Sequence, residues 1–284
     1  MGEENIIMGV NPILEALRAD RSFERIYIAS GRKGKPIQEI LNLARSRGIE
    51  IRFESRERIE QIARRAQERE RLYGSKEVEE YGGTDESPSH SRPSAPPPPH
   101  TQGVLGIASP YRYHSLEELW EEVQRKTEPP FIVLLDGIED PHNLGAILRS
   151  AEGAGVHGII LPKRRSAGLT PTVVKTSAGA LEYLPVCRVS NLASTLDRLK
   201  DYGLWIYGAV PKVGKAYYSV DLKGPVALVI GGESQGLKNL TLKKCDFLVS
   251  IPLYGKIASL NASVAAALLM FEVRQQREKK EVTR

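Results

Sequence analysis

Residues that build disulfide or metal frameworks are scarce in this chain of 284 residues. Its two cysteines, Cys187 and Cys245, lie at neither Cys-x-x-Cys nor Cys/His spacing, and its five histidines include no His-x-x-x-His pair. A disulfide framework is therefore excluded, and neither a structural zinc site nor metal catalysis is expected.

Long apolar runs are also missing. No window approaches the roughly 18 consecutive apolar residues that a membrane-spanning helix requires. The first ten residues, MGEENIIMGV, contain no basic stretch followed by an apolar one. These absences predict a cytoplasmic protein with no membrane partner.

The charge of the chain is positive. The formal net charge is +5, and the basic excess lies toward both ends of the sequence, on either side of an acidic middle. This distribution favours attraction to a polyanion such as RNA, although it does not identify a function.

The first 113 residues are expected to form a small α/β domain that a proline-rich insertion interrupts. Residues 84–102 hold six prolines and no large apolar residue, so we expect a disordered insertion at about 74–102. The apolar strand GVLGIA follows it, which places the interruption inside the domain. The other elements expected are a helix capped by Asn11 before Pro12, strands at 25–29 and 49–53, a helix at 36–48 and a charged helix from about Ser55.

The second half of the chain has the pattern of a parallel sheet. Nearly continuous apolar runs alternate with helical segments, as is typical of strands buried on both faces in an α/β domain. A helix opened by the capping pair Ser115 and Glu118 is expected to connect the two domains. Ligands of such sheets gather beyond the carboxyl ends of the strands. The expected strands are 131–136, 157–162, 204–210, 226–232 and 247–252.

The first loop of interest follows the strand at 131–136 and contains Asn143, Gly145 and Arg149. Asn143 and Arg149 are six residues apart, close to two helical turns, so we expect them to share a flank of the next helix. Gly145 would let another part of the backbone approach closely. The pair could grip a phosphate or a sugar, and a helix cap plus a surface arginine explains it equally well.

The second loop carries a single carboxylate, Glu233, among Gly231, Gly232 and Gly236. This loop is neither a dinucleotide fingerprint nor a phosphate-binding P-loop, because it lacks the glycine spacing of the first and the Gly-Lys-Ser/Thr of the second. Adjacent glycines at the end of a strand suggest that a ligand comes close, and a tight turn with a capping glutamate is the alternative.

The third loop leads into the last helix, which we expect from about Ser259 to Glu278. Ser259, Asn261 and Ser263 stand where this helix begins, and three such residues exceed what one cap needs. The sequence VAAALLMF that follows predicts a helix buried on much of its circumference.

Together the loops resemble a known family. N-x-G-x-x-x-R, G-G-E-x-x-G and S-L-N-x-S-V-A, in this order, resemble the three motifs of the SpoU/TrmH (SPOUT) family of S-adenosylmethionine-dependent RNA ribose 2′-O-methyltransferases. The segment from MGVNPILEAL to QGVLGIA is similar to the L30e-like RNA-binding domain of members that methylate a guanosine of large-subunit (bacterial 23S) ribosomal RNA. The resemblance implies an α/β fold in two domains.

The implied organisation is an L30e-like RNA substrate-binding domain at 1–113, a linker helix at 114–129 and a SpoU-type methyltransferase domain at 130–284. The resemblance further implies a deep trefoil knot in the last domain, a homodimer, S-adenosyl-L-methionine as cofactor, and no metal. The implied cofactor-binding residues are Ala209, with Val210 beside it, Gly232, Ile251 and Leu260. The implied catalytic residues are Arg149, Asn143, Glu233, Asn261 and Ser259.

Arg149 is the residue to which the resemblance assigns the chemistry. A guanidinium has a pKa above about 12 and gives up its proton with difficulty. We therefore favour a charge role for Arg149, in which it orients an RNA phosphate and stabilises the developing alkoxide while the proton leaves through phosphate or water.

Two other functions are compatible with the sequence. A sister enzyme that methylates transfer RNA, or ribosomal RNA to give antibiotic resistance, would share all three motifs. The second is a non-catalytic RNA-binding protein of ribosome assembly. Such a protein would not need four polar residues together, namely Asn143, Arg149, Glu233 and Asn261. Their joint presence favours an enzyme.

Overall fold

The computed structural model describes residues 5–79, 101–233 and 235–278. The chain divides into two compact units, one ending at Pro110 and the other beginning at Tyr111. Each unit has its own sheet and its own core.

The first unit is built on a four-stranded sheet with the order β1-β4-β2-β3. Its strands are β1 (Asn5–Met8), β2 (Phe23–Ala29), β3 (Glu50–Glu54) and β4 (Val104–Ala108). β4 lies between β1 and β2 and is antiparallel to both. The strand after the proline-rich segment therefore completes this sheet, as predicted, whereas β1 was not predicted.

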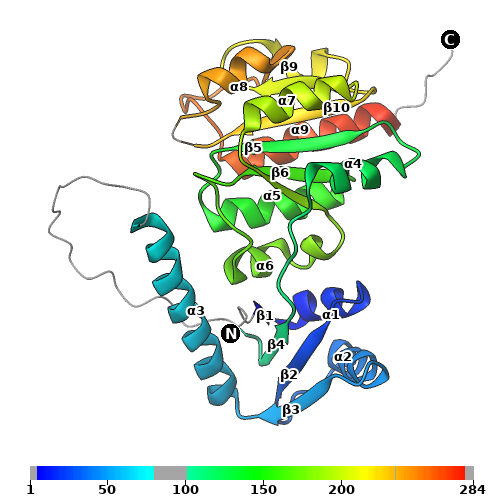
Figure 1. Cartoon of the computed structure of the whole chain (residues 1–284), viewed down its shortest axis with the longest axis vertical. Helices are drawn as coiled ribbons and strands as arrows, with labels where there is room; N and C mark the ends of the chain where they lie inside the picture. The colour runs from blue at the N-terminus through cyan, green and yellow to red at the C-terminus, as the bar shows by residue number, and fades with distance from the viewer. Residues whose placement is uncertain (1–4, 80–100, 234, 279–284) are drawn as a thin grey trace, which may run out of the picture. The chain divides into compact units, whose positions relative to one another are not determined.

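Helices cover both faces of this sheet (Figure 1). α1 (Val10–Arg18) and α2 (Lys35–Ser46) pack against each other, and each also contacts the sheet. α3 (Arg56–Glu79) forms a second layer, in which Ile59 and Ala63 are fully buried against side chains of β1, β2 and β4. The predicted helices and strands of this unit are confirmed.

Two details of the first unit correct the prediction. Asn11 is not the cap of α1, since Gly9 occupies that position and the helix begins at Val10. The Val10 N–H instead donates to Oε1 of Gln102, at 3.2 Å. Both ends of the expected disordered insertion at 74–102 are wrong, because residues 74–79 continue α3 and Thr101 is buried. Residues 80–100 lie outside the described residues.

The second unit contains a seven-stranded sheet, with all pairings parallel and the order β7-β6-β5-β10-β8-β11-β9. The five predicted strands are confirmed, and β7 and the short β9 are additions. The carboxyl ends of the strands therefore share one edge of the sheet. The strands are β5 (Phe131–Asp136), β6 (Gly158–Pro162), β7 (Val186–Val189), β8 (Trp205–Ala209), β9 (Lys215–Ala216), β10 (Val226–Gly231) and β11 (Phe247–Ser250).

One face of this sheet is covered by α4 (Leu116–Gln124), α7 (Leu192–Asp201) and α8 (Asn239–Lys244), which share a core with β5, β8 and β10. α4 corresponds to the helix expected to link the domains. It packs against β7 in the second unit and begins with the predicted capping box. Within the described residues, no helix is long and apolar enough to cross a membrane.

The other face carries α5 (Pro141–Gly153), α6 (Pro171–Ser177) and α9 (Ala262–Glu278) (Figure 1). Two short helical turns, η1 (Ala180–Glu182) and η2 (Tyr217–Ser219), complete the unit. Gly145 of α5 is confirmed as a point of close approach, because a Cβ there would lie 2.5 Å from Cβ of Thr176 in α6.

The last helix differs from its prediction in two ways. α9 begins at Ala262 rather than near Ser259, because Asn261 is its N-terminal cap. It is buried along one side only, since Val264, Leu268 and Phe271 are each 40% exposed or more. The core of a single chain therefore leaves several apolar side chains of α9 exposed.

His157 gives the second unit a predicted pH dependence. Burial, reinforced by the charge of Arg277, lowers the pKa of His157 from 6.5 to about 4, and its Nδ1 accepts the Phe131 N–H. Between these two pKa values the unfolded chain binds a proton that the folded chain does not, so stability falls as the pH drops through this window. We expect a loss of about 2–3 kcal/mol between pH 7 and pH 4.

Urea unfolding of the protein and of His157→Gln across this pH range measures the effect. The difference between the two curves isolates the histidine from the carboxylates that titrate in the same range. An identical pH slope for both proteins would contradict the assignment.

Candidate active site

Three side chains from three separate segments that follow strands meet at the carboxyl edge of the second unit's sheet. Nδ2 of Asn143 donates to Oε1 of Glu233 at 2.6 Å. Nδ2 of Asn261 donates to the same oxygen at 2.9 Å and to Oδ1 of Asn143 at 3.0 Å. Positions separated by as many as 118 residues in the sequence are thus joined in one hydrogen-bonded triangle.

The cap of α9 fixes which way Asn261 faces. Its Oδ1 accepts the N–H of Ser263 at 2.9 Å and the hydroxyl of Ser263 at 2.5 Å. Because Oδ1 is occupied by donors from the helix, the amide nitrogen must point toward Glu233 and Asn143. A capping residue therefore also belongs to the triangle.

Asn143 is held by the start of α5. Asp140 caps this helix by accepting the N–H of His142 at 2.9 Å, and Pro141 occupies the first turn. Asn143 is the third helical residue and only 8% exposed. Its amide is therefore fixed by backbone geometry as well as by its hydrogen bonds.

The glycines around Glu233 serve the chain's own packing. A Cβ on Gly231 would overlap the backbone of Gly236 and Leu237, and a Cβ on Gly232 would overlap the carbonyl oxygen of Gly137. The sequence suggested that a ligand requires these glycines. The structure gives a different reason, which is that the loops after β5 and β10 approach each other here.

Asp136 supports this corner and was not predicted. It ends β5, is 1% exposed, and its Oδ2 accepts the Lys238 N–H at 3.1 Å and the Thr241 hydroxyl at 2.7 Å. Nζ of Lys238 lies 2.9 Å from Oδ1. Asp136 thus fixes the end of the Glu233 loop, and its signal in the sequence is a lone carboxylate at the end of an apolar strand.

The predicted cofactor-binding residues lie at the same edge. Ala209 ends β8, Gly232 follows β10 and Ile251 follows β11, and these strands are neighbours in the sheet. Leu260 precedes Asn261 and is 36% exposed. Within the described residues, no backbone N–H from Ile251 to Leu260 has a hydrogen-bond partner, so this loop offers donors beside half-buried aliphatic side chains.

Two predicted site residues stand outside the triangle. Ser259 is exposed, and it forms no hydrogen bond within the described residues. Arg149 is exposed as well, whereas Asn143 is buried, so the two do not share a flank. Six residues correspond to about 9 Å along a helix and about 120° around it, so the spacing separates them.

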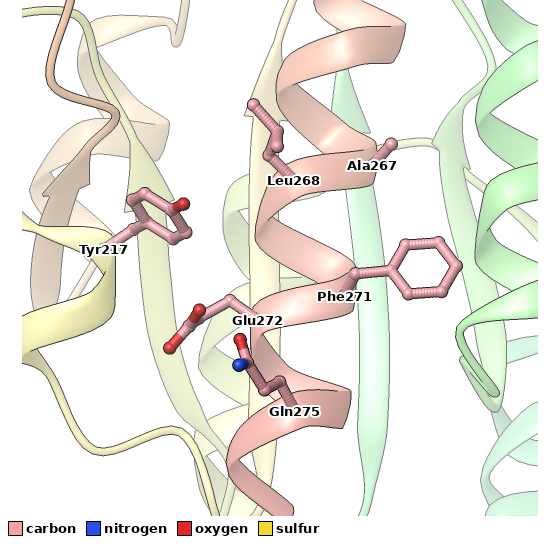
Figure 2. Close-up of a pocket in the computed structure, with 6 residues that line it drawn as sticks. All are labelled: Tyr217, Ala267, Leu268, Phe271, Glu272 and Gln275. Atoms are coloured by element: carbon pink, nitrogen blue, oxygen red, sulfur yellow. The ribbon is translucent and has the colours of Figure 1, made fainter.

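Arg149 lies on α5, the helix that packs against α9. Gly153 follows Arg149 by four residues and so lies on its flank of α5, where a Cβ would be 3.9 Å from Cζ of Phe271. Phe271 also helps to line a groove of about 360 Å³, with Leu268, Glu272 and Gln275 of α9 and with Tyr217 (Figure 2). Apolar surface of α9 thus remains open to solvent.

Comparisons with known proteins identify the family of this chain. Residues 130–271 match the model of the SpoU rRNA methylase family, and residues 6–68 match that of the RNA 2′-O ribose methyltransferase substrate-binding domain. The chain is 37% identical over 275 residues to the YacO protein of Bacillus subtilis, of the TrmH family of tRNA/rRNA methyltransferases, with 97% of each chain covered. The chain belongs to the SpoU family.

Solved structures of SpoU methyltransferases share the fold. AviRb from Streptomyces viridochromogenes, crystallised with AdoMet, aligns with a TM-score of 0.72 at 24% identity, covering 97% of this chain and 91% of AviRb. An RNA 2′-O ribose methyltransferase aligns with a TM-score of 0.69 at 26% identity, covering 97% and 89%. Within the described residues of this SpoU chain, no group of His, Cys, Asp and Glu could hold a metal ion.

Proposed function

We propose that this protein transfers a methyl group from S-adenosyl-L-methionine to a ribose 2′ oxygen. The ribose belongs to a guanosine in large-subunit ribosomal RNA. The observation that carries the proposal is the triangle of Asn143, Glu233 and Asn261, which brings the three family motifs together through hydrogen bonds.

The chemistry needs a positioned hydroxyl rather than a metal. The methyl carbon of a sulfonium already bears an excellent leaving group, a neutral thioether, so what remains is to hold the ribose oxygen in line and remove its proton. Glu233 uses Oε1 for both amide donors. This arrangement fixes the direction of the carboxylate, whose second oxygen can accept a bond from a ribose hydroxyl.

The loops beside the triangle suit the cofactor. The free N–H groups between Ile251 and Leu260 can donate to its polar atoms, and the half-buried side chains of Ala209 and Ile251 can contact its adenine ring. When bound, S-adenosylmethionine supplies an electrophilic methyl group. The residues of this chain hold it against the edge where Glu233 and Asn261 lie.

Arg149 takes part through a homodimer. The exposed stripe of α9, formed by Val264, Leu268 and Phe271, belongs to the helix that packs against α5, which carries Arg149. A second copy that covers the stripe brings Arg149 toward the partner's site, where its permanent charge can orient an RNA phosphate and stabilise the alkoxide. Ser259 would then support substrate or the neighbouring loop.

The predicted division of labour follows the two units. Residues 1–113 bind the RNA substrate, 114–129 form the connecting segment and 130–284 form the methyltransferase domain. The strand order, with β10 between β5 and β8, supports the implied trefoil knot. An enzyme with ribosomal RNA as substrate would act in the cytoplasm.

The experiment supplies methyl-labelled S-adenosylmethionine to the protein together with ribosomal RNA or transfer RNA. Label in large-subunit ribosomal RNA is the expected result, and mapping should place it on one guanosine ribose. Label in transfer RNA alone would replace the ribosomal target by the sister function. Cofactor binding without transfer to either RNA, or no cofactor binding, would contradict the proposal.

A further inference from the structure

The loop after β6 presents three consecutive cations at the carboxyl edge of the sheet. Lys163, Arg164 and Arg165 are all exposed. β6 pairs in parallel with β5, whose own loop leads to Asn143, so the two loops are neighbours at this edge. None of these cations belongs to the family motifs or to the triangle.

Backbone hydrogen bonds hold this loop in a fixed shape. At its start, the Lys163 N–H donates to the Val189 carbonyl at 2.8 Å, and Arg188 donates to the Lys163 carbonyl at 3.1 Å. At its end, the Ala167 N–H donates to the Ile138 carbonyl at 2.8 Å. The last bond ties the cationic loop directly to the loop that precedes α5 and Asn143.

One residue of this loop has a strained backbone conformation. Arg165 has a φ of 54°, in the left-handed region, although it is not a glycine. Such a conformation costs about 1 kcal/mol or more and recurs at binding sites.

The charges of Lys163 and Arg165 are not neutralised by the chain. Neither forms an ion pair within the described residues, and the same is true of Arg149 and Lys175 on the neighbouring helices. Some cations elsewhere in the unit are paired, as Arg198 is with Glu117 and Lys244 with Asp197. The edge beside Asn143 thus keeps positive charge available to a polyanion.

We propose that Lys163 and Arg165 bind backbone phosphates of the RNA next to the ribose that is methylated. This inference rests on the proposed function and names the surface that positions its substrate. A rigid cationic loop tied to the Asn143 loop sets the path of the strand relative to the triangle, whereas base recognition is left to other contacts.

The test compares the double variant Lys163→Gln/Arg165→Gln with the unmodified protein. We expect the KM for RNA to rise at least about tenfold, with kcat and cofactor affinity within about twofold. Each phosphate contact with single-stranded RNA contributes about 0.7 to the slope of log Kd against log salt concentration. Because the variant loses two such contacts, this slope should fall by about 1.4. The charge-keeping variant Lys163→Arg/Arg165→Lys should restore the KM.

A matched control removes the same two residue types from the opposite edge. Arg125 and Lys126 are exposed and lie between α4 and β5, before the strand begins. Arg125→Gln/Lys126→Gln should leave the KM for RNA within about twofold. The inference is overturned if the KM for RNA rises equally in this control. It is also overturned if the Lys163→Gln/Arg165→Gln variant keeps its KM and salt slope, or if that variant loses cofactor binding. If the unmodified protein methylates no RNA, the proposed function fails instead.

Discussion

Replacing Asn261 with aspartate should lower kcat for methyl transfer about a hundredfold or more while leaving the fold intact. Aspartate keeps an oxygen for the N–H groups of Ser263 and Val264, so the cap of α9 survives. It removes the amide that donates to Glu233 at 2.9 Å and sets a second carboxylate there. Displacement of a positioned catalytic group by 1 Å lowers the rate of reaction about a hundredfold.

A matched control exists in the same unit. Asn191 caps α7 by accepting the Ser194 N–H at 3.1 Å, and it has no contact with the triangle. Asn191→Asp should keep full activity. Both variants should unfold within about 1 kcal/mol of the unmodified protein, because aspartate and asparagine are comparable caps. Full activity of Asn261→Asp would show that the triangle is only structural.

Replacing Asp136 with alanine should destabilise the second unit by about 2–5 kcal/mol, because two hydrogen-bond donors lose a buried acceptor and Lys238, which is 40% exposed, loses its ion-pair partner. The substitution leaves the Lys238 N–H and the Thr241 hydroxyl without their acceptor in a site that is 1% exposed at Asp136. The loop that carries Glu233 ends at these residues. Urea unfolding gives the stability, and activity should fall with it.

The control for this substitution is an exposed ion pair between α7 and α8 of the same unit. Asp197 lies 2.8 Å from Nζ of Lys244 of α8, and both side chains are at least 40% exposed. Asp197→Ala should cost less than about 1 kcal/mol. Equal losses for the two alanine variants would contradict the role assigned to Asp136.

The fold was largely predictable because its strands and helices follow simple periodic rules. The runs FIVLLD and VALVIGG have the composition of strands buried on both faces, and the structure pairs them as neighbours. β9, with two residues, is too short to leave a pattern. The cap of α1 was missed because its acceptor, Gln102, lies 92 residues away in the sequence.

Three of the predicted site residues lie together in the structure, but the geometry around them was less predictable. Glu233 and Asn261 stood out as polar residues after buried strands, and they are now joined by a hydrogen bond. The reason for Gly232 could not be read from the sequence, since the atom it avoids belongs to Gly137 of another loop. Arg149 was placed on the wrong flank because a six-residue spacing is not two helical turns.

The most direct test of the account is alkaline hydrolysis of RNA labelled by this protein. Methylation of the 2′ oxygen blocks cleavage at that nucleotide, so the account predicts that the label appears in an alkali-resistant dinucleotide. With Asn261→Asp this product should fall about a hundredfold. Label recovered in mononucleotides would show transfer to a base and would contradict the central claim.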